Sequence, residues 1–303
     1  MSLIEKALRK TRELGGKPST NAVPAAATGA YERAAPAAPP GALRGTPARR
    51  LKLDLDWLRM RGMIPPDDAQ RRHVSQIRSI KNRLLRTALA SDNASDRVIM
   101  VTSALSGDGK TFSSISLALS LATERDFHVL LVDGDVPKPN VGQLFGIDSA
   151  PGLLDAARDS SLDVEQMIIG TDLPGLDLLS AGRGGVEAAE VMSSTGMRGV
   201  IQRLVSVPNR IVLLDSPPLL QTSEAAVLAQ FAGQVLLVVR EAVTPQRAVQ
   251  ESLAMLGEHA GVSLVLNGAT DSKLEKYYYG YGQDYGYGQQ AAETERPQEV
   301  AGA

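Results

Sequence analysis

The stretch VIMVTSALSGDGKTFSS, residues 98–114, decides the fold. Its first four residues form an unbroken apolar run, typical of a strand that is buried on both faces. A glycine-bearing loop follows and ends in Gly109, Lys110 and Thr111. The apolar spacing after Thr111 predicts an amphipathic helix. A strand, a glycine loop and a helix in this order form a P-loop, whose backbone N–H groups and helix N-terminus surround phosphate.

This loop predicts the residues that would contact a nucleotide. Lys110 would reach the β and γ phosphates, and the Thr111 hydroxyl would bind Mg²⁺. Gly107 and Gly109 let the backbone approach the phosphates closely. Ala104 stands where the motif usually has its first glycine. The expected nucleotide-binding residues of the loop are Ser106, Gly107, Asp108, Gly109, Lys110, Thr111 and Phe112.

The chain from Arg97 to Ala269 has a regular alternation of strand and helix patterns. Two segments with helical spacing are TFSSISLALSLATE and PQRAVQESLAMLGEHA. The strand-like segments are VIMVTS, VLLVDGD, LDLLSA, IVLLDSPP, VLLVVR and VSLVLNG. Alternation of buried strands with helices predicts an α/β fold with a doubly wound, mostly parallel sheet.

Three aspartates follow two of these strands: Asp133 and Asp135 in VLLVDGD, and Asp215 in IVLLDSPP. Ligands bind at the carboxyl ends of parallel strands. Mg²⁺ prefers few carboxylates together with water and phosphate oxygens. We therefore expect Asp135 and Asp215, with Thr111, to organise the metal, which leaves Asp133 free to orient or deprotonate a nucleophile. The simpler interpretation is that the three carboxylates only cap helices or end strands.

The composition fits a soluble globular protein, with 43% apolar and 22% charged residues and a net charge of −2. That charge gives no overall field that would attract nucleic acid or a membrane. The absence of cysteine excludes disulfides and thiolate metal ligands. The longest apolar runs are strand-length, and the first residues lack the basic-then-apolar order of a signal peptide. We expect a cytoplasmic protein that reaches the inner membrane only through a partner.

The sequence divides into five parts. Residues 1–14 predict an amphipathic helix, and residues 15–50, with 11 Ala, 6 Pro and 5 Gly, predict a disordered linker. Residues 51–95 contain an alternating arm and a basic helix at 70–86, which is either a solvated face or a contact for an acidic partner or another subunit. Residues 96–270 are the P-loop domain. Residues 271–303 are a flexible tail that holds six of the seven tyrosines.

Several motifs together resemble the bacterial tyrosine kinases that accompany exopolysaccharide export. They are MSLIEKALRK at the start, TSALSGDGKTF, LLVDGDVPKP, LLDSPPLLQTSEA and the tyrosine-rich end. The chain is most similar to the exosortase-associated tyrosine autokinases. The resemblance implies a P-loop NTPase of the deviant-Walker, MinD/ParA-like group that requires ATP and Mg²⁺.

The resemblance also implies an activity and partners. The chain would be a non-specific protein-tyrosine kinase that phosphorylates its own tail on a neighbouring subunit and regulates polysaccharide polymerisation or export. Lys110 would hold phosphate, Asp133 would activate the tyrosine, and Asn267 would contact adenine. A membrane co-polymerase would stimulate the kinase, a phosphatase would reverse it, and no nucleic acid would bind. The expected acceptors are Tyr277, Tyr278, Tyr279, Tyr281, Tyr285 and Tyr287.

The chain departs from the family pattern at three places. Pro137 stands where many relatives have arginine, so Lys138 would have to substitute for that side chain. The family's oligomerisation helix often begins with glutamate, whereas this chain has Ser75, followed by Arg78 and Lys81. Ser106 replaces a common proline, which we expect to have little effect.

Three alternatives remain open. A partition or spatial-regulator ATPase would usually have lysine where this chain has Leu105. A catalytically weak nucleotide-binding scaffold would agree with Pro137 and Ala104. The tail could also be an adhesive low-complexity segment.

Overall fold

The computed structural model describes residues 47, 49–64, 71–185, 187–259 and 261–269. In the helix at residues 71–90, side chains are described only from residue 74 onward. The strands there are β1 (Arg49–Leu51), β2 (Val98–Ser103), β3 (His128–Asp133), β4 (Ile169–Thr171), β5 (Leu176–Leu179), β6 (Arg210–Asp215), β7 (Gln234–Arg240) and β8 (Val262–Asn267). The helices are α2 (Leu55–Met60), α3 (Arg71–Ala90), η1 (Ala94–Arg97), α4 (Lys110–Leu121), α5 (Asn140–Phe145), α6 (Leu153–Arg158), α7 (Val164–Met167), α8 (Ala188–Met192), α9 (Thr195–Ser206), α10 (Ser223–Ala229) and α11 (Gln246–Leu256).

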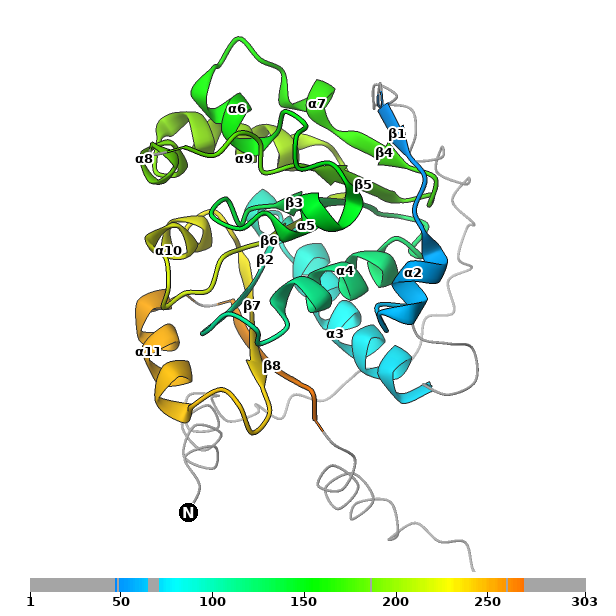
Figure 1. Cartoon of the computed structure of the whole chain (residues 1–303), viewed down its shortest axis with the longest axis vertical. Coiled ribbons are helices and arrows are strands. Elements are labelled where there is room, and N and C mark those ends of the chain that lie inside the picture. The colour runs from blue at the N-terminus through cyan, green and yellow to red at the C-terminus, as the bar shows by residue number, and fades with distance from the viewer. Residues whose placement is uncertain (1–46, 48, 65–70, 186, 260, 270–303) are drawn as a thin grey trace, which may run out of the picture. The chain divides into compact units, whose positions relative to one another are not determined.

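The strands form one sheet in the order β1-β4-β5-β3-β6-β2-β7-β8 (Figure 1). All neighbouring pairs are parallel except β4 and β5, which are antiparallel. The central strands β2, β3 and β6 are buried, as their continuous Val, Leu and Ile runs predict. The predicted doubly wound, mostly parallel sheet is therefore confirmed.

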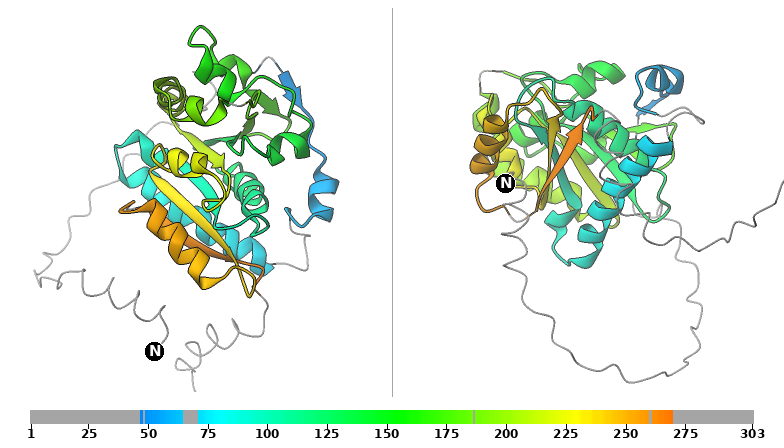
Figure 2. Two further views of the ribbon diagram at one scale, coloured as in Figure 1. Left: turned by 60° about the vertical axis from the view of Figure 1, so that its left-hand side comes forward. Right: turned by 90° about the horizontal axis from the view of Figure 1, so that it is seen from below.

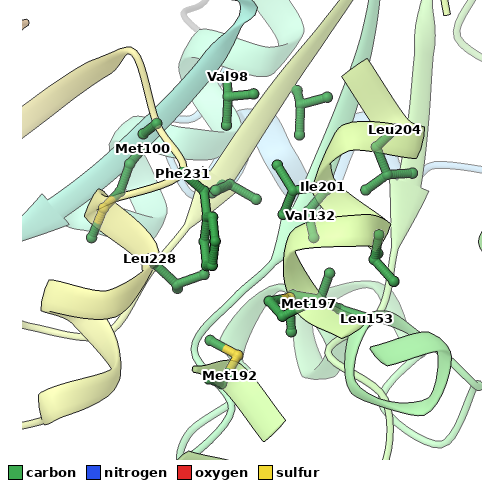
Figure 3. Close-up of a cluster of buried hydrophobic side chains, with 14 of the residues drawn as sticks. Val98, Met100, Val132, Leu153, Met192, Met197, Ile201, Leu204, Leu228 and Phe231 are labelled. Atoms are coloured by element: carbon green, nitrogen blue, oxygen red, sulfur yellow. The ribbon is translucent and has the colours of Figure 1, made fainter. Parts of the chain in front are cut away.

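Helices cover both faces of the sheet and enclose two apolar clusters. One cluster lies under α6, α8, α9 and α10 and includes Met192, Met197, Leu228 and Phe231 (Figure 3). The other lies under α2, α3, α4 and α5 and includes Leu58, Leu84 and Leu121. Figures 1 and 2 show α3 and α4 on the face opposite to α10 and α11. This two-sided cover buries the sheet, and the site lies at the carboxyl ends of its central strands.

The arm before the P-loop domain differs from the expectation. Its strand is Arg49–Leu51, which pairs with β4 and therefore begins inside the range 15–50 expected as linker. The alternating residues after it do not form a strand: residues 52–54 have no regular structure, and helix α2 begins at Leu55. The Asp54 side chain caps this helix by accepting from the Trp57 N–H. Leu58 of α2 and Leu84 of α3 are buried in the second cluster. The compact fold thus extends upstream of residue 96, the expected start of the domain.

Other expectations fall outside the described residues. They are the helix at 1–14, most of the linker and the tyrosine tail. The basic helix expected at 70–86 is present as α3. Among the described helices, none combines the length and the apolar character that spanning a membrane requires.

Candidate nucleotide site

The carboxyl ends of β2, β3 and β6 converge on the P-loop. Strand β3 ends at Asp133 and β6 ends at Asp215, and these two residues are register partners. The Gly134 N–H donates to the Asp215 carbonyl at 2.7 Å. A side chain at position 134 would place its Cβ 3.0 Å from that oxygen, which explains the glycine between the two aspartates of the DGD motif. Two of the three carboxylates, those of Asp133 and Asp215, therefore lie on neighbouring strand ends as predicted.

Lys110, the first residue of α4, lies among these carboxylates. Its Nζ is 2.6 Å from Asp135 Oδ2 and 4.0 Å from Asp215 Oδ2. Lys110 and Asp135 are 6% and 3% exposed, so the ion pair is almost fully removed from water. A buried charge without a partner is expensive. The pair therefore fixes the Lys110 ammonium group beside the carboxylates at the strand ends.

Asp215 is held by two hydroxyl groups of α4. Thr111 Oγ1 donates to Asp215 Oδ2 at 2.8 Å, and Ser114 Oγ donates to Asp215 Oδ1 at 2.9 Å. Complete burial raises the pKa of Asp215, and this effect is opposed by the Lys110 charge and by both hydroxyl groups. Thr111 and Asp215 thus lie within one hydrogen bond of each other, as a shared metal site requires.

Asp133 is fully buried and has a different environment. Its carboxylate accepts from the Gly142 N–H at 2.7 Å and from the Asp135 N–H at 3.2 Å. Burial raises the pKa of Asp133 to about 7, with a further upward contribution from the Asp215 charge and a downward one from the two N–H donors. A carboxyl with a pKa near neutrality is suited to accept a proton from a reacting hydroxyl.

The raised pKa predicts how stability changes with pH. The unfolded chain loses the Asp133 proton near pH 3.8, whereas the folded chain keeps it until about pH 7. Folding stability should therefore fall as the pH rises through this window, by about 2–4 kcal/mol from this group. Urea unfolding in EDTA, without nucleotide, should show the decline in the parent and a flatter profile in Asp133→Asn. Asp92→Asn, which removes an exposed carboxylate, is the control, and parallel profiles for parent and Asp133→Asn would contradict the assignment.

The P-loop itself has an unusual backbone that glycine permits. Gly107 and Gly109 have φ values of 90° and 100°, in the left-handed region. Asn267, the last residue of β8, lies against the loop, and its Nδ2 donates to the Asp108 carbonyl at 2.9 Å. A Cβ at Gly109 would lie 2.0 Å from that Nδ2. The described contact of Asn267 is thus with the loop backbone, and its contact with adenine stays a prediction.

These residues fit a Mg-nucleotide. The loop supplies backbone donors and a lysine, while Thr111, Asp135 and Asp215 are oxygen ligands of the kind that Mg²⁺ prefers. Within the described residues, no three His, Asp or Glu side chains form a complete metal site. Phosphate oxygens and water would therefore have to complete the coordination.

Comparison with known proteins finds a matching family model and several relatives. Residues 96–255 match the family model described as an AAA domain, AAA_31. The VpsO kinase domain, a solved structure, is 31% identical and has a TM-score of 0.53, and the match covers 63% of this chain and 98% of that domain. YwqD of Bacillus subtilis, a tyrosine-protein kinase, is 27% identical over 73% of this chain and 92% of its own length.

This chain belongs to the family of bacterial tyrosine-protein kinases. A further relative, the inferred tyrosine-protein kinase EpsB of Ralstonia solanacearum, is 36% identical over 208 residues, or 67% of this chain. The match covers 27% of EpsB, so the chain spans about a quarter of the length of this larger kinase. The predicted P-loop NTPase fold is confirmed by the sheet and by these matches.

Sequence patterns alone did not indicate several residues of this site. Ser114, which binds Asp215, lies four residues after Lys110 on the same helical face, a spacing that could have indicated it. Thr244 and Arg240, which contact the loop from outside, lie in a segment without any recognisable motif. Lys138, the suggested substitute for the missing arginine, is exposed, and its backbone N–H contacts Asp135.

Proposed function

We propose that this protein is an ATP- and Mg²⁺-dependent tyrosine autokinase whose substrate is its own C-terminal tyrosine cluster. One observation carries the proposal: β8 runs parallel to β7, as β7 does to β2, and ends at Asn267, whose side chain contacts the P-loop. The chain that bears Tyr277 and the following tyrosines therefore leaves the sheet at the edge where Lys110 and the aspartates lie. The relative YwqD is named a tyrosine-protein kinase, which supports the same activity for this chain.

Each site residue has a role in this proposal. The loop residues 106–112 and Lys110 would hold the phosphates, and Thr111, Asp135 and Asp215 would hold Mg²⁺. Bound Mg-ATP would supply the phosphoryl group. A phenol with an ordinary pKa near 10 is a weak nucleophile. Asp133, with its pKa raised to about 7, would orient the phenol and accept its proton.

The proposal extends to the assembly. We place the tail of one copy at the site of a neighbouring copy, because the resemblance to the tyrosine autokinases implies phosphorylation between subunits. A membrane co-polymerase would stimulate the enzyme and bring it to the inner membrane, and a phosphatase would reverse the modification. Six phosphotyrosines would add roughly −9 to −12 charge, at −1.5 to −2 each. The tail charge would then regulate how copies associate during exopolysaccharide synthesis or export.

A donor–acceptor experiment tests this proposal. The donor has the six tail tyrosines replaced by Phe, and the acceptor carries Lys110→Met. With Mg-ATP, the parent should show phosphotyrosine on residues 277–287 by mass spectrometry, and neither variant alone should show any. A mixture of donor and acceptor should restore phosphorylation on the acceptor tail. ATP turnover without phosphotyrosine would favour a switch ATPase, and nucleotide binding without turnover, even with the co-polymerase added, would favour a scaffold.

A further inference from the structure

We infer that the segment Arg240–Thr244, which begins with the last residue of β7 and continues into the turn before α11, positions the P-loop for phosphate binding. It does so by holding carbonyl groups of the loop on the side away from the phosphates. The inference rests on the proposed nucleotide site and assigns Thr244 and Arg240 as positioning residues. Nothing in the P-loop motif itself requires either residue.

The first contact is made through Asp108. Asp108 is only 2% exposed. Its Oδ1 accepts from Thr244 Oγ1 at 2.7 Å, and its Oδ2 accepts from the Leu105 N–H at 3.0 Å. One oxygen of the Asp108 carboxylate thus links residues 105 and 108 of the loop. The other oxygen is bound by Thr244 of the segment Arg240–Thr244.

The next contacts engage the loop carbonyls. Arg240 Nη1 donates to the Gly107 carbonyl at 3.2 Å. Asn267 Nδ2 donates to the following carbonyl, that of Asp108, at 2.9 Å. Two successive carbonyl oxygens of the loop therefore have donors from the ends of β7 and β8.

The orientation of these carbonyls matters for an anion. A phosphate binds a nest of backbone N–H groups, whereas a carbonyl oxygen turned toward it is repelled. In a peptide unit the N–H and the C=O point in opposite directions. Donors that hold the carbonyls of Gly107 and Asp108 outward therefore direct the N–H groups of Asp108 and Gly109 inward. The hydrogen bonds to the two carbonyl groups therefore orient the loop N–H groups for phosphate before any ligand binds.

The segment has its own fixed geometry. The Arg240 N–H donates to Thr244 Oγ1 at 2.9 Å, and the Thr244 N–H donates to the Arg240 carbonyl at 3.0 Å. Ala242, between them, has a φ of 57°, which is uncommon for a residue other than glycine. Such a conformation is kept where surrounding contacts fix it, often near functional sites. Thr244 thus closes the turn and anchors Asp108 with the same hydroxyl group.

The test compares ligands with and without phosphate. Thr244→Val removes the hydroxyl at nearly constant volume, and should weaken Mg-ADP binding about 5–30-fold by calorimetry. Adenosine has no phosphate to place, so its affinity, measured by ligand-observed NMR, should change less than about two-fold. Amide hydrogen exchange at residues 105–109 of the free protein should become faster. Thr244→Ser should restore parent behaviour, and Thr123→Val, which removes an exposed hydroxyl from the turn after α4, should match the parent.

The outcomes separate this inference from the proposed function. Unchanged Mg-ADP affinity in Thr244→Val overturns the inference and leaves the kinase proposal intact. An equal loss for adenosine and ADP also overturns it, because that result indicates a general structural role. A parent that binds no Mg-ADP overturns both. If Thr244→Val does not fold, Arg240→Met removes the donor to the Gly107 carbonyl from an exposed position and should weaken Mg-ADP about 3–10-fold, again without affecting adenosine.

Discussion

Replacing Lys110 with methionine should reduce phosphorylation of the tail tyrosines at least about 100-fold, the range found when a preorganised charge-stabilising group is removed from an active site. The Nζ lies at the N-terminus of α4, 2.6 Å from Asp135 and 4.0 Å from Asp215. In this position the cation would balance phosphate charge that the carboxylates repel. The measurement is the initial rate of phosphotyrosine formation with saturating Mg-ATP, using a tail-only acceptor chain.

The Lys110 experiment needs a folding control, because the variant leaves Asp135 buried without its partner. Circular dichroism and thermal unfolding should show that the variant is folded under assay conditions. Lys52→Met, which removes an exposed lysine, should phosphorylate the tail at the parent rate. A folded Lys110→Met protein that retains more than a tenth of the parent rate would contradict the proposed site.

The second large effect is expected for Asp133→Asn, which should lower the phosphorylation rate by about 10²–10⁴-fold through loss of the proton acceptor. Mg-ATP affinity should stay within about three-fold of the parent. The two oxygens of Asp133 bind the N–H groups of Gly142 and Asp135, and neither binds Lys110 or Thr111. The rate and the affinity should therefore separate, which distinguishes a base from a phosphate or metal ligand.

Two comparisons make the Asp133 result decisive. Asp215→Asn should weaken Mg-ATP binding as well as catalysis, because Asp215 accepts from Thr111 beside Lys110. Asp92→Asn should change neither quantity. If Asp133→Asn and Asp215→Asn lose affinity and rate in the same proportion, Asp133 is not the base and belongs with the metal ligands.

The central strands and the convergence of charged residues could be predicted from the sequence because both depend on local patterns. A run such as VIMV is typical of a buried strand, and the ends of parallel strands share an edge of the sheet. These two rules are enough to bring Lys110, Asp133 and Asp215 together at one edge. Helix α4 was predicted because its apolar spacing matches the helical period.

The outer parts of the fold could not be predicted in this way. β1 has only three residues, two of them arginine, so it has neither an apolar run nor alternation, and its pairing with β4 is a long-range contact. The Asp54 cap favours a helix that begins at Leu55, whereas the alternating pattern of the same residues favours a strand. Thr244 contacts Asp108 across 136 positions of sequence, and such a hydrogen bond has no local signal.

The strand order has a final consequence for how copies can be arranged. β1 and β8 are the two outermost strands, separated by seven inter-strand steps or about 34 Å at 4.8 Å each. The chain therefore enters this unit along one border of the sheet at Arg49 and departs from the opposite border at Asn267. In the proposed assembly, a partner bound to the chain ahead of β1 and the tail that follows β8 would therefore be attached at opposite borders of the sheet.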